Sequence, residues 1–446
     1  MRALLVGLAV AWAALAAEEF RAGVARVDIT PATPVWMSGY AQRNKPSEGV
    51  DTPLMAKALA LQDKKGMRVV IVTTDLLGLP RAITDPVAAR AEKEYGLRRA
   101  QILFNSSHTH AGPVLRTNTQ AMYELPDAEW KRLADYHVKL GDDLFAVIGA
   151  ALGKMEPASL HFGQGTAGFA VNRREFTRKG VIIGVNRDGA TDHSVPVIDV
   201  RNAKGEHLAI LFGYACHNTT LGGNHYRLNA DYAGHAQMLL EKQFASATAL
   251  FLLLCAGDQN PDPRGTVDHV AKHGSALAAS VAKVLEAGGD LMRSPIRAAY
   301  QVTDLAFAVH TREQYEEEAK SPDVYKQRRA KAMLAAYATG KPPRSTPYPV
   351  QAIRFAPGIT LLALGGEVVV DYALRVKREF THDRMIVAGY SNDVMCYIPT
   401  LKVLREGGYE ADFSMVYYGT PGKFSEDVEA AVFQSIGSVL RRTGAK

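Results

Sequence analysis

The segment Ile102-Leu-Phe-Asn-Ser-Ser-His108-Thr-His110-Ala-Gly112-Pro113 runs from an apolar stretch into two histidines and a Gly-Pro turn. In extended backbone, residues two positions apart point to the same side, so His108 and His110 can direct both imidazoles into one pocket. Neutral imidazole is a frequent zinc ligand, and the segment is therefore a candidate metal half-site at the end of a strand. In a chain with 13 histidines such a pair also occurs by chance, so the metal-site interpretation depends on the rest of the sequence.

Apolar stretches of strand length alternate with helical segments on both sides of this segment. Strands are predicted at 20–30, 56–62, 68–73, 101–105 and 249–254, with strand-rich regions at 159–213 and 360–400. Helices are predicted at 85–95, 127–154, 233–244 and 271–287. This alternation predicts an α/β fold in which layered mixed β-sheets are flanked by helices. No repeat or low-complexity tract interrupts it, so we expect a single large domain.

Residues 311–342 form a separate charged and helical segment that leads into Pro342 and Pro343. Its composition is typical of a solvated surface helix. A lid over a cleft is the alternative interpretation.

The N-terminal residues have the pattern of a secretory signal peptide. A single positive charge at Arg2 precedes an apolar run, residues 4–12, that is too short to span a bilayer. The segment Ala14-Leu15-Ala16 has the small residues of a cleavage site, with cleavage near Ala16 or Ala17. We therefore expect residues 1–17 to be a signal peptide and residues 18–446 to form the mature protein, either secreted or periplasmic.

The formal net charge is +6, but the basic residues are scattered along the chain and do not form a stripe interleaved with aromatic residues. This distribution argues against nucleic-acid binding and is compatible with peripheral contact to an anionic membrane surface. Three cysteines are too few for a disulfide framework. The simplest interpretation of Cys216, Cys255 and Cys396 is that they are small buried side chains. The alternatives are that two of them form a disulfide or that their thiolates bind a soft metal.

Polar side chains recur directly after the predicted apolar strands. They are Asp75, His108, His110, His217, Asp258, Asn260, Glu367 and Tyr397. In α/β sheets the carboxyl ends of strands are where sites are built, so these side chains can converge. Two or three nitrogen ligands with a carboxylate make a catalytic zinc site that leaves one position open for water. Taken singly, the aspartates also fit turn caps and the histidines also fit buried core residues.

Several short motifs follow one another in a fixed order along the chain. They are Gly23 to Pro31 with Gly39-Tyr40, His108-Thr-His110-Ala-Gly112-Pro113, Asn172-Arg173, Cys216-His217-Asn218-Thr219, Gly366-Glu367, Ser391-Asn392 with Tyr397, and Tyr409-Glu410. In content and order they resemble the signatures of the neutral, non-lysosomal ceramidases, among them H-T-H-S-G-P and P-G-E. The resemblance covers most of residues 20–440. It implies that residues 18–446 are that family's catalytic domain, without its C-terminal β-sandwich domain.

The resemblance implies an amide hydrolase that uses zinc-activated water. The zinc ligands that it implies are His108, His217, Glu367 and Tyr397. The residues that it implies around the substrate are His110, Arg173, Asn260 and Tyr409, of which His110 and Tyr409 orient the carbonyl or share in proton transfer. The family has a serine at the position of Asn260. A side-chain amide can donate to an oxyanion but cannot act as a hydroxyl nucleophile.

Three functions stay open on these grounds. The leading hypothesis is an exported zinc-dependent hydrolase that cleaves a linear amide, either N-acylsphingosine-like or another N-acyl substrate. The second is a two-metal hydrolase in which His108 and His110 both bind and Asp75 or Asp258 bridges. The third is a non-catalytic ligand-binding relative, because Asn260 replaces the family serine. The expected partner is a small-molecule or lipid amide substrate, and no protein partner is inferred.

Overall fold

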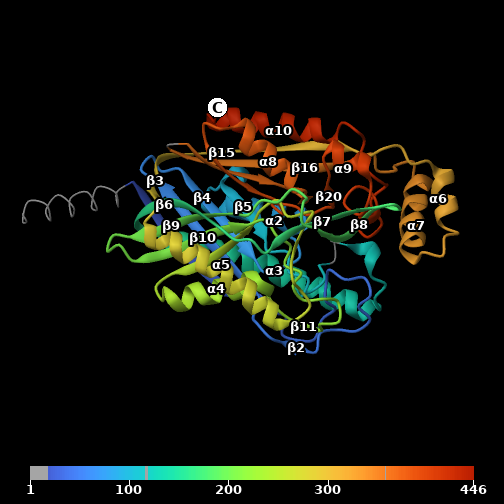
Figure 1. Cartoon of the computed structure of the whole chain (residues 1–446), viewed down its shortest axis with the longest axis horizontal. Helices are drawn as coiled ribbons and strands as arrows, with labels where there is room; N and C mark the ends of the chain where they lie inside the picture. Colours follow the sequence, from blue (N-terminus) through green and yellow to red (C-terminus); the bar gives the residue numbers. More distant parts are fainter. Residues whose placement is uncertain (1–18, 116–118, 357, 446) are drawn as a thin grey trace, which may run out of the picture.

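The structure is a computed structural model that describes residues 19–115, 119–356 and 358–445. Helices flank mixed β-sheets, which confirms the α/β fold class predicted from the sequence. Figure 1 shows the strands in the interior of the molecule and the helices on its outside. The predicted signal peptide, residues 1–17, lies outside the described residues.

The largest sheet has nine strands. They are β1 (Phe20–Asp28), β3 (Met55–Asp63), β4 (Arg68–Thr74), β5 (Ile102–Ser106), β6 (Glu156–Thr166), β9 (Ser194–Asn202), β10 (His207–Tyr214), β12 (Thr248–Leu253) and β14 (Asp290–Leu291). Their order is β12-β10-β9-β6-β1-β3-β4-β5, with β14 beside β6. The pairs β4–β5 and β10–β12 are parallel, and β3 and β4 form an antiparallel hairpin.

The second sheet has four strands, and three smaller sheets complete the set that the described residues form. The four strands are β15 (Arg293–Ala306), β16 (Ser345–Ala356), β17 (Ile359–Leu364) and β19 (Arg384–Ala388), paired in chain order. A three-stranded sheet places β7 (Ala170–Thr177) between β13 (Gln259–Pro261) and β8 (Gly180–Asn186). Two short pairs join β18 (Glu367–Val368) to β20 (Tyr397–Ile398) and β2 (Gly49–Val50) to β11 (Arg227–Leu228).

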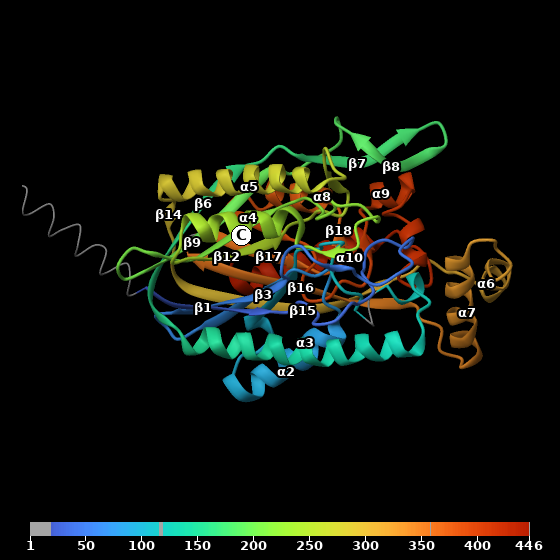
Figure 2. The ribbon, with the colours of Figure 1, turned by 90° about the horizontal axis from the view of Figure 1, so that it is seen from below.

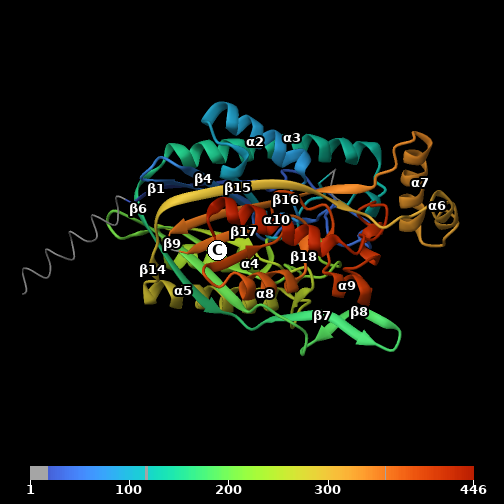
Figure 3. The ribbon, with the colours of Figure 1, turned by 90° about the horizontal axis from the view of Figure 1, so that it is seen from above.

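Helices cover the outer faces of both large sheets, as Figures 2 and 3 show from opposite sides. They are α2 (Arg81–Tyr95), α3 (Asp127–Gly153), α4 (Asp231–Gln243), α5 (Val267–Ala287), α8 (Val370–Glu379), α9 (Leu401–Glu406) and α10 (Val428–Thr443), with the 3-10 turns η1 (Arg99–Gln101), η2 (Gln120–Met122) and η3 (Phe413–Val416). Apolar side chains of the two large sheets pack directly on each other between these helical layers. Helix α5 begins earlier than predicted because the Thr266 hydroxyl caps it by accepting from His269 N.

The three cysteines are buried and their thiols are free. Cys255 and Cys396 belong to the core beneath the four-stranded sheet, and Cys216 packs among the residues covered by α4. Small core residues are therefore the correct interpretation of all three.

The two edges of the nine-stranded sheet meet at Asn105, near the end of β5. The Asn105 side chain donates to Leu253 O at 3.2 Å and accepts from Leu253 N at 2.8 Å, on the far edge strand β12. A backbone bridge also pairs Asn105 with Ser391, which follows β19 of the four-stranded sheet. Three strand ends therefore meet at one buried point, three residues before His108.

The charged segment 311–342 forms a helical hairpin, α6 (Arg312–Glu318) and α7 (Val324–Ala338), at one end of the molecule (Figure 1). The Tyr325 hydroxyl on α7 donates to Ala41 O at 3.3 Å and ties the hairpin to the body. Among the described helices, none is both long and apolar enough to cross a membrane.

Candidate active site

His108 and His217 follow two strands of the nine-stranded sheet, β5 and β10, and both are fully buried. Nδ1 of His108 lies 2.5 Å from Leu77 O, and Nδ1 of His217 lies 2.7 Å from Ala256 O. A carbonyl oxygen only accepts, so each Nδ1 carries the ring proton and each Nε2 presents a lone pair. Burial and the Arg173 guanidinium lower the pKa of His217 to about 3, which keeps the ring neutral. Both rings are therefore prepared as nitrogen ligands.

Glu367 and Tyr397 are brought together by the short parallel pair β18–β20. Gly366, just before Glu367, has a φ of 74°, and a Cβ at this position would lie 2.6 Å from Cγ1 of Ile398. Glycine alone combines that backbone conformation with so close an approach. The Gly366-Glu367 motif therefore has a geometric reason, which is to deliver the carboxylate beside the strand of Tyr397.

The Glu367 carboxylate lies between the two imidazoles. Its Oε2 is 3.1 Å from Nε2 of His108 and 3.2 Å from Nε2 of His217. The Tyr397 hydroxyl is 3.3 Å from the same nitrogen of His217. The structure thus gathers all four residues that the family resemblance implied as ligands.

His110 adds a third imidazole to this group. The nitrogens of His108, His110 and His217 lie within 4.8 Å of one another, a spacing that could hold a metal ion. Nε2 of His110 is 3.0 Å from Nε2 of His108, while its buried Nδ1 has no hydrogen-bond partner among the described residues. Burial and the neighbouring imidazoles hold the pKa of His110 well below its ordinary value. The ring is neutral and can serve as a further ligand or accept a proton.

Arg173 enters the site from β7 and is held by Glu410. Its Nε donates to Glu410 Oε1 at 2.7 Å, and its Nη2 donates to the Tyr397 hydroxyl at 3.0 Å. Its Nη1 lies 3.2 Å from Nε2 of His217. Burial would lower the pKa of Arg173, but Tyr397 and Glu410 raise it well above its ordinary value. Burial raises the pKa of the Tyr397 phenol, and the permanent charge of Arg173 opposes that effect.

Asn260 and Tyr409 complete the group of predicted residues. Oδ1 of Asn260 accepts from the Thr219 hydroxyl at 3.3 Å and lies 3.5 Å from Nη1 of Arg173. The NH2 group of the amide takes no part in these contacts and is the donor that Asn260 can offer. The Tyr409 ring packs edge-on to Tyr397 with centroids 5.4 Å apart, and burial raises the pKa of Tyr409.

Asp75 and Asp258 serve as structural acceptors. Asp75 accepts from Met55 N at 3.0 Å and from the Gln237 amide at 3.2 Å. Asp258 accepts at 2.8 Å from Val370 N, in the first turn of α8. Neither carboxylate belongs to the group of ligating side chains that the described residues place within metal-binding distance.

The family model for neutral/alkaline non-lysosomal ceramidase, N-terminal, matches residues 20–284, more than half of the chain. The chain belongs to this family. The neutral ceramidase of Drosophila melanogaster is 24% identical over 250 residues, which cover 54% of this chain and 35% of that protein. Neutral ceramidase 2 of Arabidopsis thaliana is 35% identical over 94 residues, covering 20% and 12% of the two chains.

The crystal structure of neutral ceramidase from Pseudomonas aeruginosa has a TM-score of 0.74 with this chain at 20% identity, covering 95% of this chain and 74% of that one. This likeness confirms the fold. The chain spans about a third of the length of the Drosophila relatives it matches. The family match at 20–284 includes His108, His217 and Arg173, whereas Glu367 and Tyr397 lie beyond it and reach the same pocket through the fold.

Two further tyrosines of this ceramidase-family fold contact Glu367 and were not found by sequence reasoning. The Tyr418 hydroxyl donates to Oε1, and the Tyr390 hydroxyl donates to Oε2 at 3.3 Å. Tyr390 comes just after β19, and this position at a strand end is the sequence feature that could have identified it as a site residue. Tyr418 follows η3 in a loop, and nothing distinguishes it among 18 tyrosines.

Proposed function

We propose that this chain is a zinc-dependent hydrolase that cleaves the amide bond of an N-acyl lipid of the ceramide type. The observation that carries the proposal is the convergence of Nε2 of His108 and Nε2 of His217 on Oε2 of Glu367, at 3.1 and 3.2 Å, in a buried pocket. Membership of the neutral/alkaline ceramidase family supports amide hydrolysis as the reaction class.

The donor set fits a zinc ion. Two neutral imidazole nitrogens and a carboxylate are the ligand types of catalytic zinc sites, and Tyr397 offers a further oxygen. Each imidazole is oriented by a carbonyl oxygen at its other nitrogen, as is usual for metal-binding histidines. A buried carboxylate such as Glu367 is also costly without a cation beside it. When bound, zinc supplies Lewis acidity to a substrate carbonyl and to water.

The surrounding residues provide the remaining chemistry of amide hydrolysis. His110, held neutral by burial, accepts a proton from the attacking water and returns it to the departing amine. Tyr409, kept protonated by its raised pKa, donates a hydrogen bond to the substrate carbonyl. The NH2 group of Asn260 donates to the oxygen that becomes negative in the transition state. Arg173 holds the Tyr397 phenol at 3.0 Å and fixes its orientation.

Asn260 favours a second candidate function. In the resembling family a serine hydroxyl occupies this position, and an amide cannot relay a proton in the way a hydroxyl does. The second candidate is therefore a relative that binds an N-acyl lipid without releasing the fatty acid. It shares the pocket and the metal site with the first candidate and differs only in turnover.

Export belongs to the same proposal. The pattern of residues 1–17 supports cleavage of a signal peptide and a mature domain of residues 18–446, secreted or periplasmic. N-terminal sequencing of the protein recovered outside the cytoplasm tests this, and an N-terminus that still begins at Met1 would contradict it.

Elemental analysis of the purified protein, paired with amide hydrolysis before and after chelation, tests the main proposal. The substrates are N-acylsphingosine and a short-chain, water-dispersed N-acyl amide. We expect about one zinc per chain and chelator-sensitive release of the amine. One zinc with no cleavage of either amide would support the second candidate. Two metals per chain would favour a binuclear site, and a metal-free protein would overturn the site.

A further inference from the structure

The hairpin β7–β8 exposes a concentration of large apolar side chains. Phe176, Ile182, Ile183 and Val185 are each between 45 and 60% exposed. They are four of the twelve large hydrophobic residues that are exposed in the described part of the chain, and they lie within ten consecutive positions. Single exposed apolar residues are ordinary, but a cluster of them marks a contact surface.

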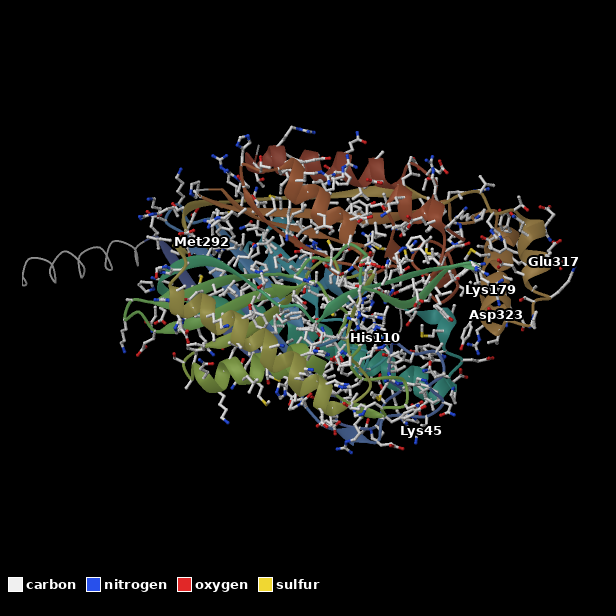
Figure 4. All side chains as sticks on the ribbon, viewed as in Figure 1. Lys45, His110, Lys179, Met292, Glu317 and Asp323 are labelled. Atoms are coloured by element: carbon white, nitrogen blue, oxygen red, sulfur yellow. The ribbon has the colours of Figure 1, made fainter. Side chains whose placement is uncertain are left out.

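The turn of this hairpin is positively charged. Arg178 and Lys179 occupy the turn, and neither takes part in an ion pair within the described residues. Arg187, just beyond β8, pairs with Asp262, and the Glu175 carboxylate accepts from Val185 N at 3.2 Å. Two unpaired cations therefore stand beside the apolar cluster. Figure 4 shows Lys179 far from His110, toward the end of the molecule that carries α6 and α7.

The same small sheet leads from the exposed tip into the candidate active site. Asn260 on β13 pairs with Val171 on β7, and Arg173 follows two residues later on β7. Phe176 is three residues beyond Arg173, which corresponds to about 10 Å along an extended strand. Figures 2 and 3 show the hairpin standing out from the body beside α9. The exposed cluster is thus one strand length from the site.

A second exposed aromatic residue adjoins the hairpin. Val181 on β8 packs closely on Gly408, where an added Cβ would lie 3.0 Å from the Val181 Cβ. Phe413 donates its backbone N–H to Gly408 O at 3.4 Å, and its side chain is 63% exposed. Tyr409, the neighbour of Gly408, lies in the candidate site. The exposed apolar residues therefore belong to the same two segments that supply Arg173 and Tyr409.

We propose that this hairpin surface, defined by Phe176, Ile182, Ile183, Val185, Phe413, Arg178 and Lys179, docks the protein on an anionic lipid bilayer. Apolar side chains enter the boundary between headgroups and acyl chains, while adjacent cations contact anionic headgroups. The net charge, which is +6 over the full sequence and +5 without Arg2 of the proposed signal peptide, acts in the same direction. The inference rests on the proposed function, because docking here brings the site to the depth at which an N-acyl lipid presents its amide.

Co-sedimentation with phosphatidylcholine vesicles, with and without phosphatidylglycerol, measures the docking directly. We expect the wild-type chain to bind the anionic vesicles more tightly. The double variant Arg178→Glu/Lys179→Glu should weaken that binding by at least fivefold for each charge, since one basic residue near the surface is worth about fivefold. The triple variant Phe176→Ser/Ile182→Ser/Ile183→Ser should weaken binding to both vesicles by about tenfold or more.

Val138→Ser is the matched control, because Val138 is an exposed valine on α3, away from the hairpin. All variants should keep the wild-type melting temperature, since the replaced side chains face solvent. Hydrolysis of the short-chain amide is measured in parallel and should not change. Loss of vesicle binding with no hydrolysis by any form would support docking and contradict the proposed function. Three results would overturn docking, whatever the hydrolysis shows. The wild-type protein would not bind vesicles, would form dimers through the hairpin, or would bind vesicles no more tightly than the hairpin variants.

Discussion

Glu367 and Tyr397 stand in register with each other across the parallel pair β18–β20, although thirty positions separate them in the sequence. Glu367 N donates to Cys396 O at 2.9 Å, so backbone hydrogen bonds fix the approach of the two segments. The relative position of the two side chains therefore depends on the main chain around them. Backbone changes here should damage the site even when every ligand is present.

Gly366→Ala should abolish metal binding without removing a ligand. The added methyl would meet Cγ1 of Ile398 at 2.6 Å in a residue with φ of 74°, and Glu367 would be displaced. Gly340→Ala, at the end of α7 and away from the site, is the control, because Gly340 also has a positive φ, 70°, and open space around its Cβ. Each variant places an L side chain at positive φ, which costs about 1–2 kcal/mol. Zinc content by elemental analysis should fall only in Gly366→Ala, and an equal zinc content in both variants would contradict this account of Glu367.

His217→Ala and Glu367→Ala should each remove metal and activity together, because each side chain supplies part of one coordination shell. His161→Ala, which changes a histidine that contacts Ser159 on β6, should leave both unchanged. Zinc content and amide hydrolysis are measured on the same preparations. Full activity in either ligand variant would mean that the metal is held elsewhere.

His110→Ala separates proton transfer from metal binding. If His110 moves the proton, the variant keeps about one zinc per chain and loses roughly 10²–10⁴-fold in kcat, the range for general acid–base residues. A binuclear site predicts instead that metal content falls as well, because His110 lies 3.0 Å from His108 and would share in holding a second ion. The ratio of zinc to protein in this one variant decides between the two.

Asn260→Ser introduces the hydroxyl that the family resemblance implies at this position. Hydrolysis of N-acylsphingosine should increase if the amide at Asn260 limits turnover, because a hydroxyl can both donate to an oxyanion and relay a proton. Asn260→Ala is the control, since it removes the contacts to Thr219 and Arg173 without adding a hydroxyl. A rate in Asn260→Ser no higher than in the wild type would place the limit in the shape of the pocket.

Asp393 should make the fold less stable as pH rises through mild acid. Burial raises its pKa from 3.8 to about 6, although its Oδ1 accepts from Arg81 N at 3.0 Å. The folded state binds this proton more tightly than the unfolded chain, so the stabilisation is present below pH 3.8 and is lost by about pH 6. The loss is about 3 kcal/mol. Asp393→Asn cannot ionise and should abolish it.

Urea unfolding of wild type and Asp393→Asn at acidic and neutral pH measures the difference between their unfolding free energies. That difference should change between the two conditions, whereas Asp135→Asn, at an exposed position on α3, should track the wild type throughout. A difference that does not depend on pH would mean that Asp393 ionises normally in the fold.

The fold class and most strands follow from the sequence because apolar runs and their polar ends are local patterns. His108, His217 and Glu367 could be predicted for the same reason, since each stands directly after a strand. The closure of the large sheet could not, because it depends on a contact between Asn105 and Leu253 across 148 positions. The exposure of Ile182 and Ile183, in the apolar run Val181-Ile182-Ile183, could not be predicted either. A local sequence pattern shows that a strand is apolar, but it does not show whether a second layer of the fold covers that strand.

The four proposed ligands come from two different structural units. His108 and His217 follow strands of the nine-stranded sheet, whereas Glu367 and Tyr397 lie beside the four-stranded sheet. A cation held by all four is therefore a cross-link, and its release would loosen the packing between the sheets. Free metal at a hundred times the dissociation constant adds about 2.7 kcal/mol to the stability of the native state. If the protein is exported as we propose, its lifetime among proteases would depend on its metal supply, and unloaded copies would be degraded first.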